Sequence, residues 1–192
     1  MLFKQLFPSI NIRQIPAAKL VSIALFRALL ISNFANNTGV ELRVMAQSWL
    51  ILELGASQIW VGAATGLRVV PAIILGLFAG VMVDRLGGRI VLLWERAMLL
   101  LLAVLTALVV VSGAVTLWQI VVLSIVSSAA LALGMPAMQS LIMNYVPKES
   151  LQAANSMHSL SYSLSRAIGP LSGGVLIAGF GLGSPFVVLI GL

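Results

Sequence analysis

The sequence predicts an all-α membrane protein, and three features indicate it. Hydrophobic residues make up 60% of the 192 residues and charged residues only 8%, whereas charged residues form about a quarter of an ordinary soluble domain. Mean hydropathy is +1.12. Apolar runs of about 20 residues or more, the length that crosses a bilayer as a helix, recur along the chain. A soluble globular fold is therefore excluded.

Each expected helix is an apolar run that ends at a turn signal. The first run ends at GASQ, the second at DRLGGR, the third at SGAVT, the fourth at VPKES and the fifth at GFGLGS. These breaks are short and rich in residues that favour turns, so consecutive helices are expected to be antiparallel. The runs are residues 20–54, 59–83, 90–111, 117–145 and 151–180, and a sixth begins at Ser184.

The sixth run is shorter than the others. SPFVVLIGL supplies about half of the residues that a crossing needs, and no basic residue follows it. We therefore expect a six-helix bundle at residues 20–192 with a truncated sixth helix. Residues 1–19 are expected to form a cytoplasmic arm, because Pro8 and Pro16 interrupt any apolar core that a cleavable signal would need.

Lysine and arginine lie on one side of the expected bundle. They precede the first run, separate the second from the third and separate the fourth from the fifth, whereas the other three breaks contain neither residue. Because basic loops face the cytoplasm, the N-terminus and these two loops are expected there. The residues concerned are Lys4, Arg13, Lys19, Arg85, Arg89 and Lys148.

Composition excludes several classes of function. The net charge of +6 does not indicate a nucleic-acid partner, because the basic residues are dispersed along apolar helices and not clustered with aromatic residues. The lack of cysteine excludes disulfides and thiolate metal sites. The motifs HExxH, GxSxG and GxxxxGKS/T do not occur, so we expect no enzyme, no metal and no other cofactor.

The turn after the second run carries the most specific motif, GLFAGVMVDRLGGR at residues 76–89. It resembles the cytoplasmic loop between the second and third helices of major facilitator superfamily (MFS) transporters, where a glycine and three further residues precede D-R-x-G-R and another basic residue. Ile90 stands where the family usually has that second basic residue. The matching residues are Gly80, Asp84, Arg85, Gly87 and Arg89.

The chemistry of this turn indicates a conformational latch. Charges at the water boundary end the apolar run, and glycines allow a short turn. The carboxylate of Asp84 can cap the N-terminus of a neighbouring helix and pair with Arg89. Such a latch breaks when the protein changes conformation; the alternative is a charged turn that only fixes topology.

The fifth run contains a second motif, G-P-x-x-G-G. It resembles the fifth-helix motif of facilitator exporters and antiporters, although Ser156 and Ser165 stand where that motif has glycines. Small residues let helices approach closely and proline kinks a helix, so a gate is expected here, with generic helix packing as the alternative. The residues of this gate are Ser165, Gly169, Pro170, Gly173 and Gly174.

Longer phrases, including FRALLISNFANNTG and WLILELGAS, resemble a bacterial facilitator branch that includes enterobactin-type siderophore exporters and drug-efflux permeases, over residues 26–186. The resemblance implies the N-terminal bundle of a two-bundle transporter in the bacterial inner membrane. It also implies proton-coupled export of a small amphipathic or anionic molecule by alternating access. The implied partners are the bilayer, the small-molecule substrate, protons and the missing C-terminal half.

Ionisable residues inside the runs are candidates for function, because charge is costly in a bilayer. Three arginines accompany one carboxylate, and the helical rise places Glu41, Arg68 and Arg166 at similar depth. An anionic substrate, acids of the absent half, or separate structural pairs can balance the arginines. The residues expected to line the substrate and proton cavity are Asn37, Glu41, Arg43, Gln47, Arg68 and Arg166.

Individual roles follow from residue chemistry. Glu41 is the candidate for proton coupling, because a carboxylate in an apolar site can bind and release a proton near neutral pH, with a permanent ion pair as the alternative. His158 is expected to be a packing residue, with a proton shuttle as the alternative. Glu53, Glu95 and Arg96 lie near the ends of runs and are expected to be interfacial anchors. A non-transporting membrane receptor or assembly subunit, and an inactive or dimerising half-transporter, stay open as other functions.

Overall fold

The computed structural model describes residues 20 and 22–190, and every regular element within them is helical. The predicted all-α class is confirmed, and the fourth and fifth helices have the predicted bounds. The arm predicted at residues 1–19 and the last two residues lie outside the described residues. The elements are α3 (Ala24–Glu53), α4 (Gln58–Leu67), α5 (Val69–Leu86), α6 (Gly88–Val111), α7 (Leu117–Tyr145), the 3₁₀ turn η2 (Lys148–Ser150), α8 (Leu151–Phe180) and α9 (Ser184–Val188).

Helices of membrane-spanning length dominate the fold. By length and composition, three helical segments in the described part of the chain can cross a membrane: Gln58–Leu86, Gly88–Val111 and Leu117–Tyr145, each with a mean hydropathy of 2.1. Helices α3 and α8 are more polar but have 30 residues each, which at 1.5 Å per residue is about 45 Å. Large apolar side chains such as Leu77 and Trp94 point outward, as expected of a surface that lipid covers.

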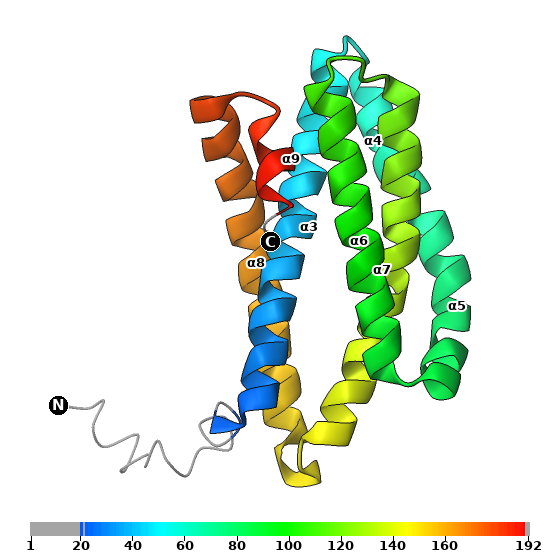
Figure 1. The fold of residues 1–192 in the computed structure, drawn as a ribbon, viewed down its shortest axis with the longest axis vertical. Helices are drawn as coiled ribbons and strands as arrows, with labels where there is room; N and C mark the ends of the chain where they lie inside the picture. Colours follow the sequence, from blue (N-terminus) through cyan, green and yellow to red (C-terminus); the bar gives the residue numbers. More distant parts are fainter. Residues whose placement is uncertain (1–19, 21, 191–192) are drawn as a thin grey trace, which may run out of the picture.

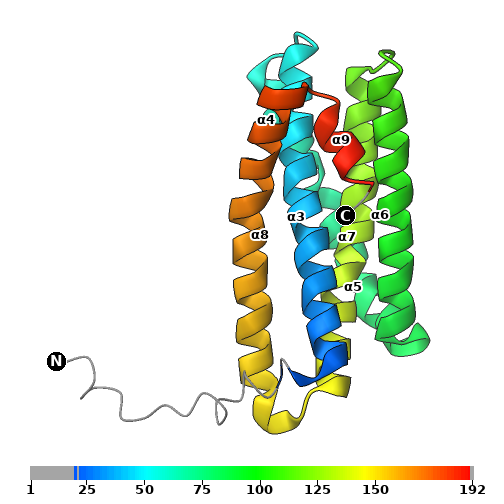
Figure 2. The same ribbon diagram turned by 60° about the vertical axis from the view of Figure 1, so that its left-hand side comes forward.

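The helices form two groups that lie side by side (Figures 1 and 2). One group contains α3 and α8, which pack along their length; the other contains α5, α6 and α7, with both α5 and α6 packed against α7. The short helix α9 lies between the groups and contacts α3, α6 and α8. Contacts between α3 and α7 and between α7 and α8 are much sparser. Of the three most closely packed helix pairs, α6 and α7 are consecutive in sequence, whereas α3 with α8 and α5 with α7 are not.

Apolar clusters close the bundle at both ends. One cluster packs Leu42, Ile51 and Ile120 around Phe186 of α9, which is completely buried. The second packs Phe26 of α3 against Met138 and Ile142 of α7, near the α7–α8 connection. The buried polar residues of α3 lie at positions 33–47, where Leu42 and Ala46 of the first cluster alternate with them. Among the described residues, the side-chain hydrogen bonds from α3 to α6, α7 and the α4–α5 break come from this stretch.

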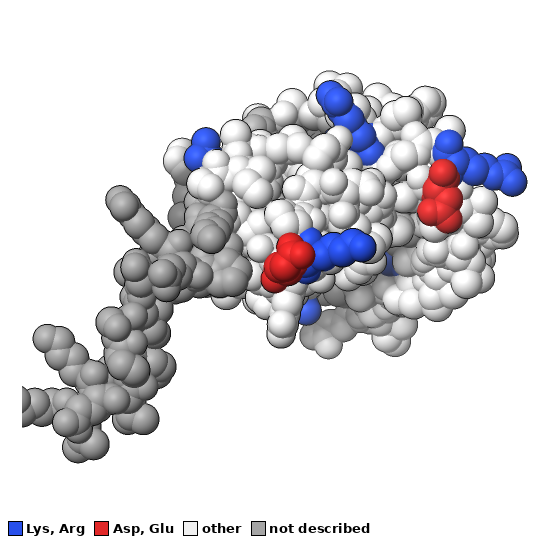
Figure 3. Space-filling view, turned by 90° about the horizontal axis from the view of Figure 1, so that it is seen from below, with Lys and Arg blue, Asp and Glu red and all other residues white. Residues whose placement is uncertain are grey.

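Exposed charges gather at the end that carries the α5–α6 and α7–α8 connections. Figure 3 views the molecule from this end and shows basic side chains around the rim, some with acidic side chains beside them. Asp84, Arg85 and Arg89 surround the α5–α6 connection, and Lys148 and Glu149 belong to η2; all five are exposed.

Candidate functional site

A cavity of about 610 Å³ lies between α3, α7 and the break between α4 and α5. Arg43 and Gln47 reach it from α3, and Arg68 occupies the break between the two short helices. Helix α7 contributes hydroxyl groups at a spacing of three and four residues, which places them on one helix face. These hydroxyls belong to Ser124, Ser127 and Ser128.

Arg68 is held by neutral polar groups from two helices. Its Nη2 donates to Gln47 Oε1 at 2.5 Å and to Ser124 Oγ at 3.1 Å. Ser128 Oγ donates to the backbone carbonyl of Arg68, at the α4–α5 break. At this break the backbone carbonyl of Arg68 therefore accepts a hydrogen bond from α7, and the Arg68 guanidinium points toward α3.

Arg43 is more deeply buried, with 5% of its surface exposed. Its Nη1 donates to Ser127 Oγ at 3.2 Å. Among the described residues the ion pairs are Glu41–Arg166 and Glu95–Arg96, so neither Arg43 nor Arg68 is paired with a carboxylate. Gln47 Nε2 and Arg68 Nε are buried without a hydrogen-bond partner. The cavity is thus lined by two positive charges and by two hydrogen-bond donors that have no acceptor among the described residues.

Glu41 and Arg166 meet at a different place. Arg166 Nε lies 3.7 Å from Glu41 Oε1, and its guanidinium lies 5.9 Å from the Tyr162 ring centroid. The Arg166 side chain is 64% exposed and that of Glu41 22% exposed, so this is a loose ion pair at the surface of the α3–α8 pair. The four ionisable residues grouped by sequence therefore separate into the Arg43–Arg68 cavity and the Glu41–Arg166 pair.

A second cavity, of about 370 Å³, lies among α3, α6, α7 and α8. Glu41 and Asn37 line it, as does His158. Gln47 lines the first cavity and Asn37 the second. Their role in a substrate and proton cavity remains a prediction.

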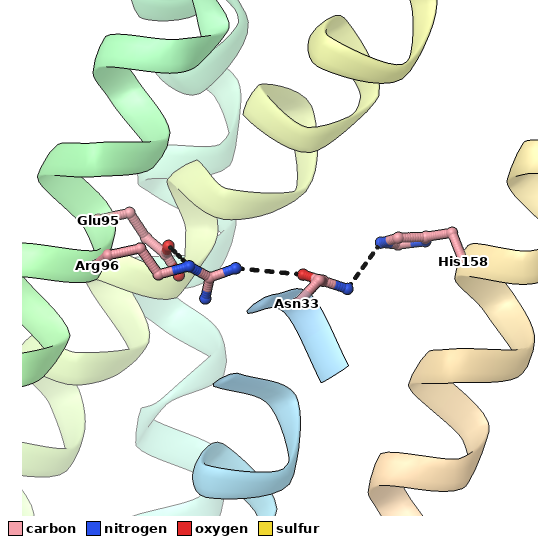
Figure 4. Close-up of polar contacts among 4 residues, drawn as sticks. All are labelled: Asn33, Glu95, Arg96 and His158. Atoms are coloured by element: carbon pink, nitrogen blue, oxygen red, sulfur yellow. Dashed lines mark hydrogen bonds and ion pairs between the residues drawn. The ribbon is translucent and has the colours of Figure 1, made fainter. Parts of the chain in front are cut away.

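A chain of polar contacts crosses this second cavity, from α6 through α3 to α8 (Figure 4). Arg96 Nε lies 3.4 Å from Glu95 Oε2, and Arg96 Nη2 donates to Asn33 Oδ1 at 3.3 Å. Asn33 Nδ2 lies 3.1 Å from His158 Nε2. His158 is partly buried and engaged by a side chain from another helix.

The prediction that Glu95 and Arg96 are interfacial anchors is wrong. Glu95 is 2% exposed and packs against Gly134 of α7, where an added Cβ would lie 3.0 Å from Glu95 Oε1. Helix α6 begins at Gly88, before the apolar run, so both residues lie about two turns inside the helix. Glu53, in contrast, is the last residue of α3 and is exposed.

The residues of the predicted latch surround the α5–α6 connection. Helix α5 continues to Leu86, so Asp84 and Arg85 belong to its last turn. Gly87 ends the helix with φ +84°, a conformation that favours glycine. Asp84 and Arg89 form no ion pair within the described residues, and Gly80 is exposed with open space around it. The latch remains a prediction.

The predicted gate residues lie along the α3–α8 contact. Ser165 is completely buried and donates to the Phe34 carbonyl of α3 at 3.1 Å. A Cβ at Gly169 would lie 2.5 Å from Glu41 Cβ, and one at Gly173 would lie 3.2 Å from Met45 Sδ. Helix α8 runs through Pro170 without interruption, and Gly174 has more room. These residues allow close packing here, and their role as a gate remains a prediction.

Two groups of site residues were missed from the sequence: the serines of α7 and the Asn33–Arg96 connection. The serine spacing was a usable signal, because Ser124, Ser127 and Ser128 recur on one helix face inside an apolar run. The Asn33–Arg96 bond had no such signal, since the two residues are 63 positions apart.

Comparison with known proteins identifies one family and two relatives. The family described as "Transmembrane secretion effector" matches residues 17–189. The staphyloferrin A transporter of Staphylococcus aureus (strain NCTC 8325 / PS 47) is 26% identical over 132 residues, which are 68% of this chain and 33% of that protein. The uncharacterized MFS-type transporter YfiS of Bacillus subtilis (strain 168) is 30% identical over 166 residues, 85% of this chain and 38% of that protein. The chain thus spans less than two fifths of either relative. No solved structure gave a significant match.

Proposed function

The chain belongs to the transmembrane secretion effector family of MFS-type transporters and is a multi-pass membrane protein, and from this premise we propose that it forms the N-terminal bundle of a secondary active exporter. The exported molecule is small and anionic, or amphipathic with an anionic group. A second bundle completes the substrate site, because facilitators bind substrate between two bundles. The staphyloferrin A transporter among the relatives supports a siderophore as one possible substrate.

The observation that carries this proposal is the pair of arginines without carboxylate partners. Arg43 and Arg68 face one cavity and hydrogen-bond only to neutral groups there. A guanidinium that no carboxylate contacts directly is costly in a low-dielectric site, so an anion that enters the cavity gains charge-assisted hydrogen bonds from both guanidiniums. The free donors on Gln47 Nε2 and Arg68 Nε add to this preference.

The exporter is proposed to work by proton antiport in the bacterial inner membrane. Glu41 lines the second cavity with a loosely paired carboxylate, so it is accessible to protons. The exposed basic residues Arg85, Arg89 and Lys148 support an orientation with the α5–α6 and α7–α8 connections, and hence the N-terminus, on the cytoplasmic side.

Alternating access in this scheme uses the two motifs. The α5–α6 connection with Asp84, Arg85 and Arg89 forms contacts that hold one state, and the α3–α8 contact at Gly169 and Pro170 changes as the bundle rocks. Asp84→Asn is then expected to leave membrane insertion intact and to slow transport.

Flux measurements in proteoliposomes test the function. The protein is reconstituted with pyranine, a pH dye, trapped inside, and a proton gradient is imposed. Staphyloferrin A and citrate are offered as anionic probes and tetraphenylphosphonium as a lipophilic cation. We expect an anion to collapse the gradient and Glu41→Gln to abolish that response. Two results would contradict the proposal. One is transport of the cation but of neither anion; the other is binding of an anion without proton movement, as expected of a receptor.

A further inference from the structure

The contacts around Asn33 determine which atom of His158 carries a proton. Arginine has only donors, so the Asn33 atom that faces Arg96 Nη2 must be the carbonyl oxygen. The amide nitrogen of Asn33 therefore faces His158 Nε2 and needs an acceptor there. His158 Nε2 accepts only when it carries no proton, which places the single proton of the neutral ring on Nδ1.

Protonation of His158 is incompatible with this arrangement. A proton on Nε2 turns that atom into a donor that faces the amide donor of Asn33. The amide can rotate to offer its oxygen to His158, but its nitrogen then faces Arg96, again donor against donor. Either way one bond of the chain is lost, and the connection between α8 and α6 through α3 is broken.

We propose that His158 is a proton-binding residue of this bundle, and that the amide of Asn33 transmits its protonation to the Glu95–Arg96 pair on α6. This inference deepens the proton coupling of the proposed function. It adds a second proton acceptor beside Glu41, which lines the same cavity.

The Glu95–Arg96 pair on α6 has unused hydrogen-bonding atoms, which such a response requires. Glu95 Oε2, Arg96 Nε and Arg96 Nη1 are buried without hydrogen-bond partners, and the Glu95–Arg96 distance of 3.4 Å is an ion pair rather than a short hydrogen bond. When the Asn33 side-chain oxygen no longer accepts from Arg96, the Arg96 guanidinium can move closer to the Glu95 carboxylate, which contacts α7 at Gly134. The signal then reaches α6 and α7, the other group of helices.

The charged and titratable groups around His158 come from three helices. Helix α3 contributes Glu41, and α6 contributes Glu95 and Arg96; on α8 itself lie Tyr162, which lines the cavity, and Arg166, which pairs with Glu41. The α7 residues that line the cavity are apolar: Leu131, Gly134, Met135 and Met138. Glu41 is therefore the group whose titration must be separated from that of His158.

The first test measures the tautomer directly. His158 is the single histidine of the 192-residue sequence, so ¹⁵N-histidine labelling of the chain in lipid nanodiscs reports on it alone. At high pH the ring nitrogen shifts are expected to show a proton on Nδ1 and none on Nε2. A neutral ring with its proton on Nε2 would overturn the proposal, whatever transport experiments show.

The second test asks whether protonation moves the helices. The sequence has no cysteine, so Leu93→Cys on α6 and Leu160→Cys on α8, both at exposed positions, take spin labels without competing sites. The distance between the labels is expected to change in the pH range in which His158 titrates. A distance that stays constant while the histidine titrates would contradict transmission through Asn33.

Two substitutions are expected to remove this pH response by opposite routes. His158→Gln offers a permanent acceptor to Asn33, so the chain stays closed at every pH. Asn33→Asp accepts from both Arg96 and protonated His158, so protonation no longer breaks the chain. Glu53→Gln at the exposed end of α3 is the control and is expected to keep the full response. Glu41→Gln is the comparison that separates the two proton acceptors. A response that survives His158→Gln but disappears in Glu41→Gln would overturn the proposal and assign the response to Glu41.

These results are independent of the identity of the substrate. If the tautomer and the distances behave as expected but no anion is transported, the proposed function fails and the proton site stands. If Asn33→Asp does not fold, the wild-type titration and His158→Gln still decide the question.

Discussion

At the scale of single residues, the partner of each arginine decides what the arginine can do. Arg96 lies beside the carboxylate of Glu95, and their charges balance within the protein. Arg43 has a serine hydroxyl as its hydrogen-bond partner and is almost completely buried. The ion pair of Arg96 is therefore expected to stabilise the folded protein. Burial of Arg43 without a directly paired carboxylate is expected to destabilise it, and a bound anion would offset this cost.

Glu95→Ala is expected to destabilise the protein. It leaves the partly buried Arg96 without its counterion and opens a space against Gly134. The loss should be about 2–3 kcal/mol in the free energy of unfolding, below the range for fully buried pairs because Arg96 keeps some exposure. Thermal unfolding in detergent measures it, with Glu53→Ala at the exposed end of α3 as the control that should change little.

Arg43→Met should have the opposite effect on stability. Methionine fills a similar volume and removes a buried charge that has no carboxylate partner. We expect an unchanged or higher melting temperature together with loss of anion transport. A lower melting temperature would show that Arg43 is required for folding and would weaken its assignment to binding.

At the scale of elements, the α3–α8 pair shows why small residues recur in α8. Gly169 has no space for a Cβ, because Glu41 Cβ and the Thr38 carbonyl lie at 2.5 Å and 2.9 Å from its ideal position. Gly174, one turn and a half further along the same helix, has its nearest neighbour at 3.8 Å. The backbones therefore approach most closely at Gly169.

Gly169→Ala and Gly174→Ala form a matched pair of variants. Gly169→Ala should cost about 1–3 kcal/mol through overpacking and should displace Glu41 from Arg166. Gly174→Ala adds the same methyl group in ordinary van der Waals contact with Met45 and should be neutral or slightly stabilising. Unfolding measurements on both variants test the packing, and equal effects would show that α3 and α8 do not pack as described.

Most elements could be predicted because few backbone conformations satisfy every backbone hydrogen-bonding group inside a bilayer. Inside a bilayer each backbone donor must be satisfied within the chain, so an apolar run of sufficient length becomes a helix. The run at 117–145 accordingly matches α7. The run at 59–83, predicted as one helix, is instead broken at Arg68 into α4 and α5. The rotation of a helix about its axis is not set by hydropathy in this way. This is why burial of Glu95 and the bond from Asn33 to Arg96 could not be predicted, whereas the position of Gln47 in a cavity could.

At the scale of the whole molecule, polar contacts connect two groups of helices that the apolar clusters and α9 also join. Arg43–Ser127 and Arg68–Gln47 connect α3 with α7 and with the α4–α5 break, and Asn33–Arg96 connects α3 with α6. Each connection borders either the first or the second cavity. An anion in the first cavity and a proton in the second would therefore act on the same boundary between α3–α8 and α5–α7.

The orientation of the whole bundle can be tested with single cysteines. Lys148→Cys in η2 and Ser112→Cys after α6 lie in connections at opposite ends of the bundle, and both positions are exposed. In intact cells an impermeant maleimide is expected to label Ser112→Cys and not Lys148→Cys, with both labelled after lysis. The reverse pattern would place the N-terminus outside the cytoplasm.

The central claim is that Arg43 and Arg68 make this cavity a site for an anion, and equilibrium binding measures it most directly. Citrate, staphyloferrin A and tetraphenylphosphonium are titrated into the protein in nanodiscs and into Arg43→Gln and Arg68→Gln. We predict that at least one anion binds and that each substitution weakens it about tenfold or more, the equivalent of one charge-assisted hydrogen bond. Anion affinity that both substitutions leave unchanged, or binding of the cation alone, would contradict the account.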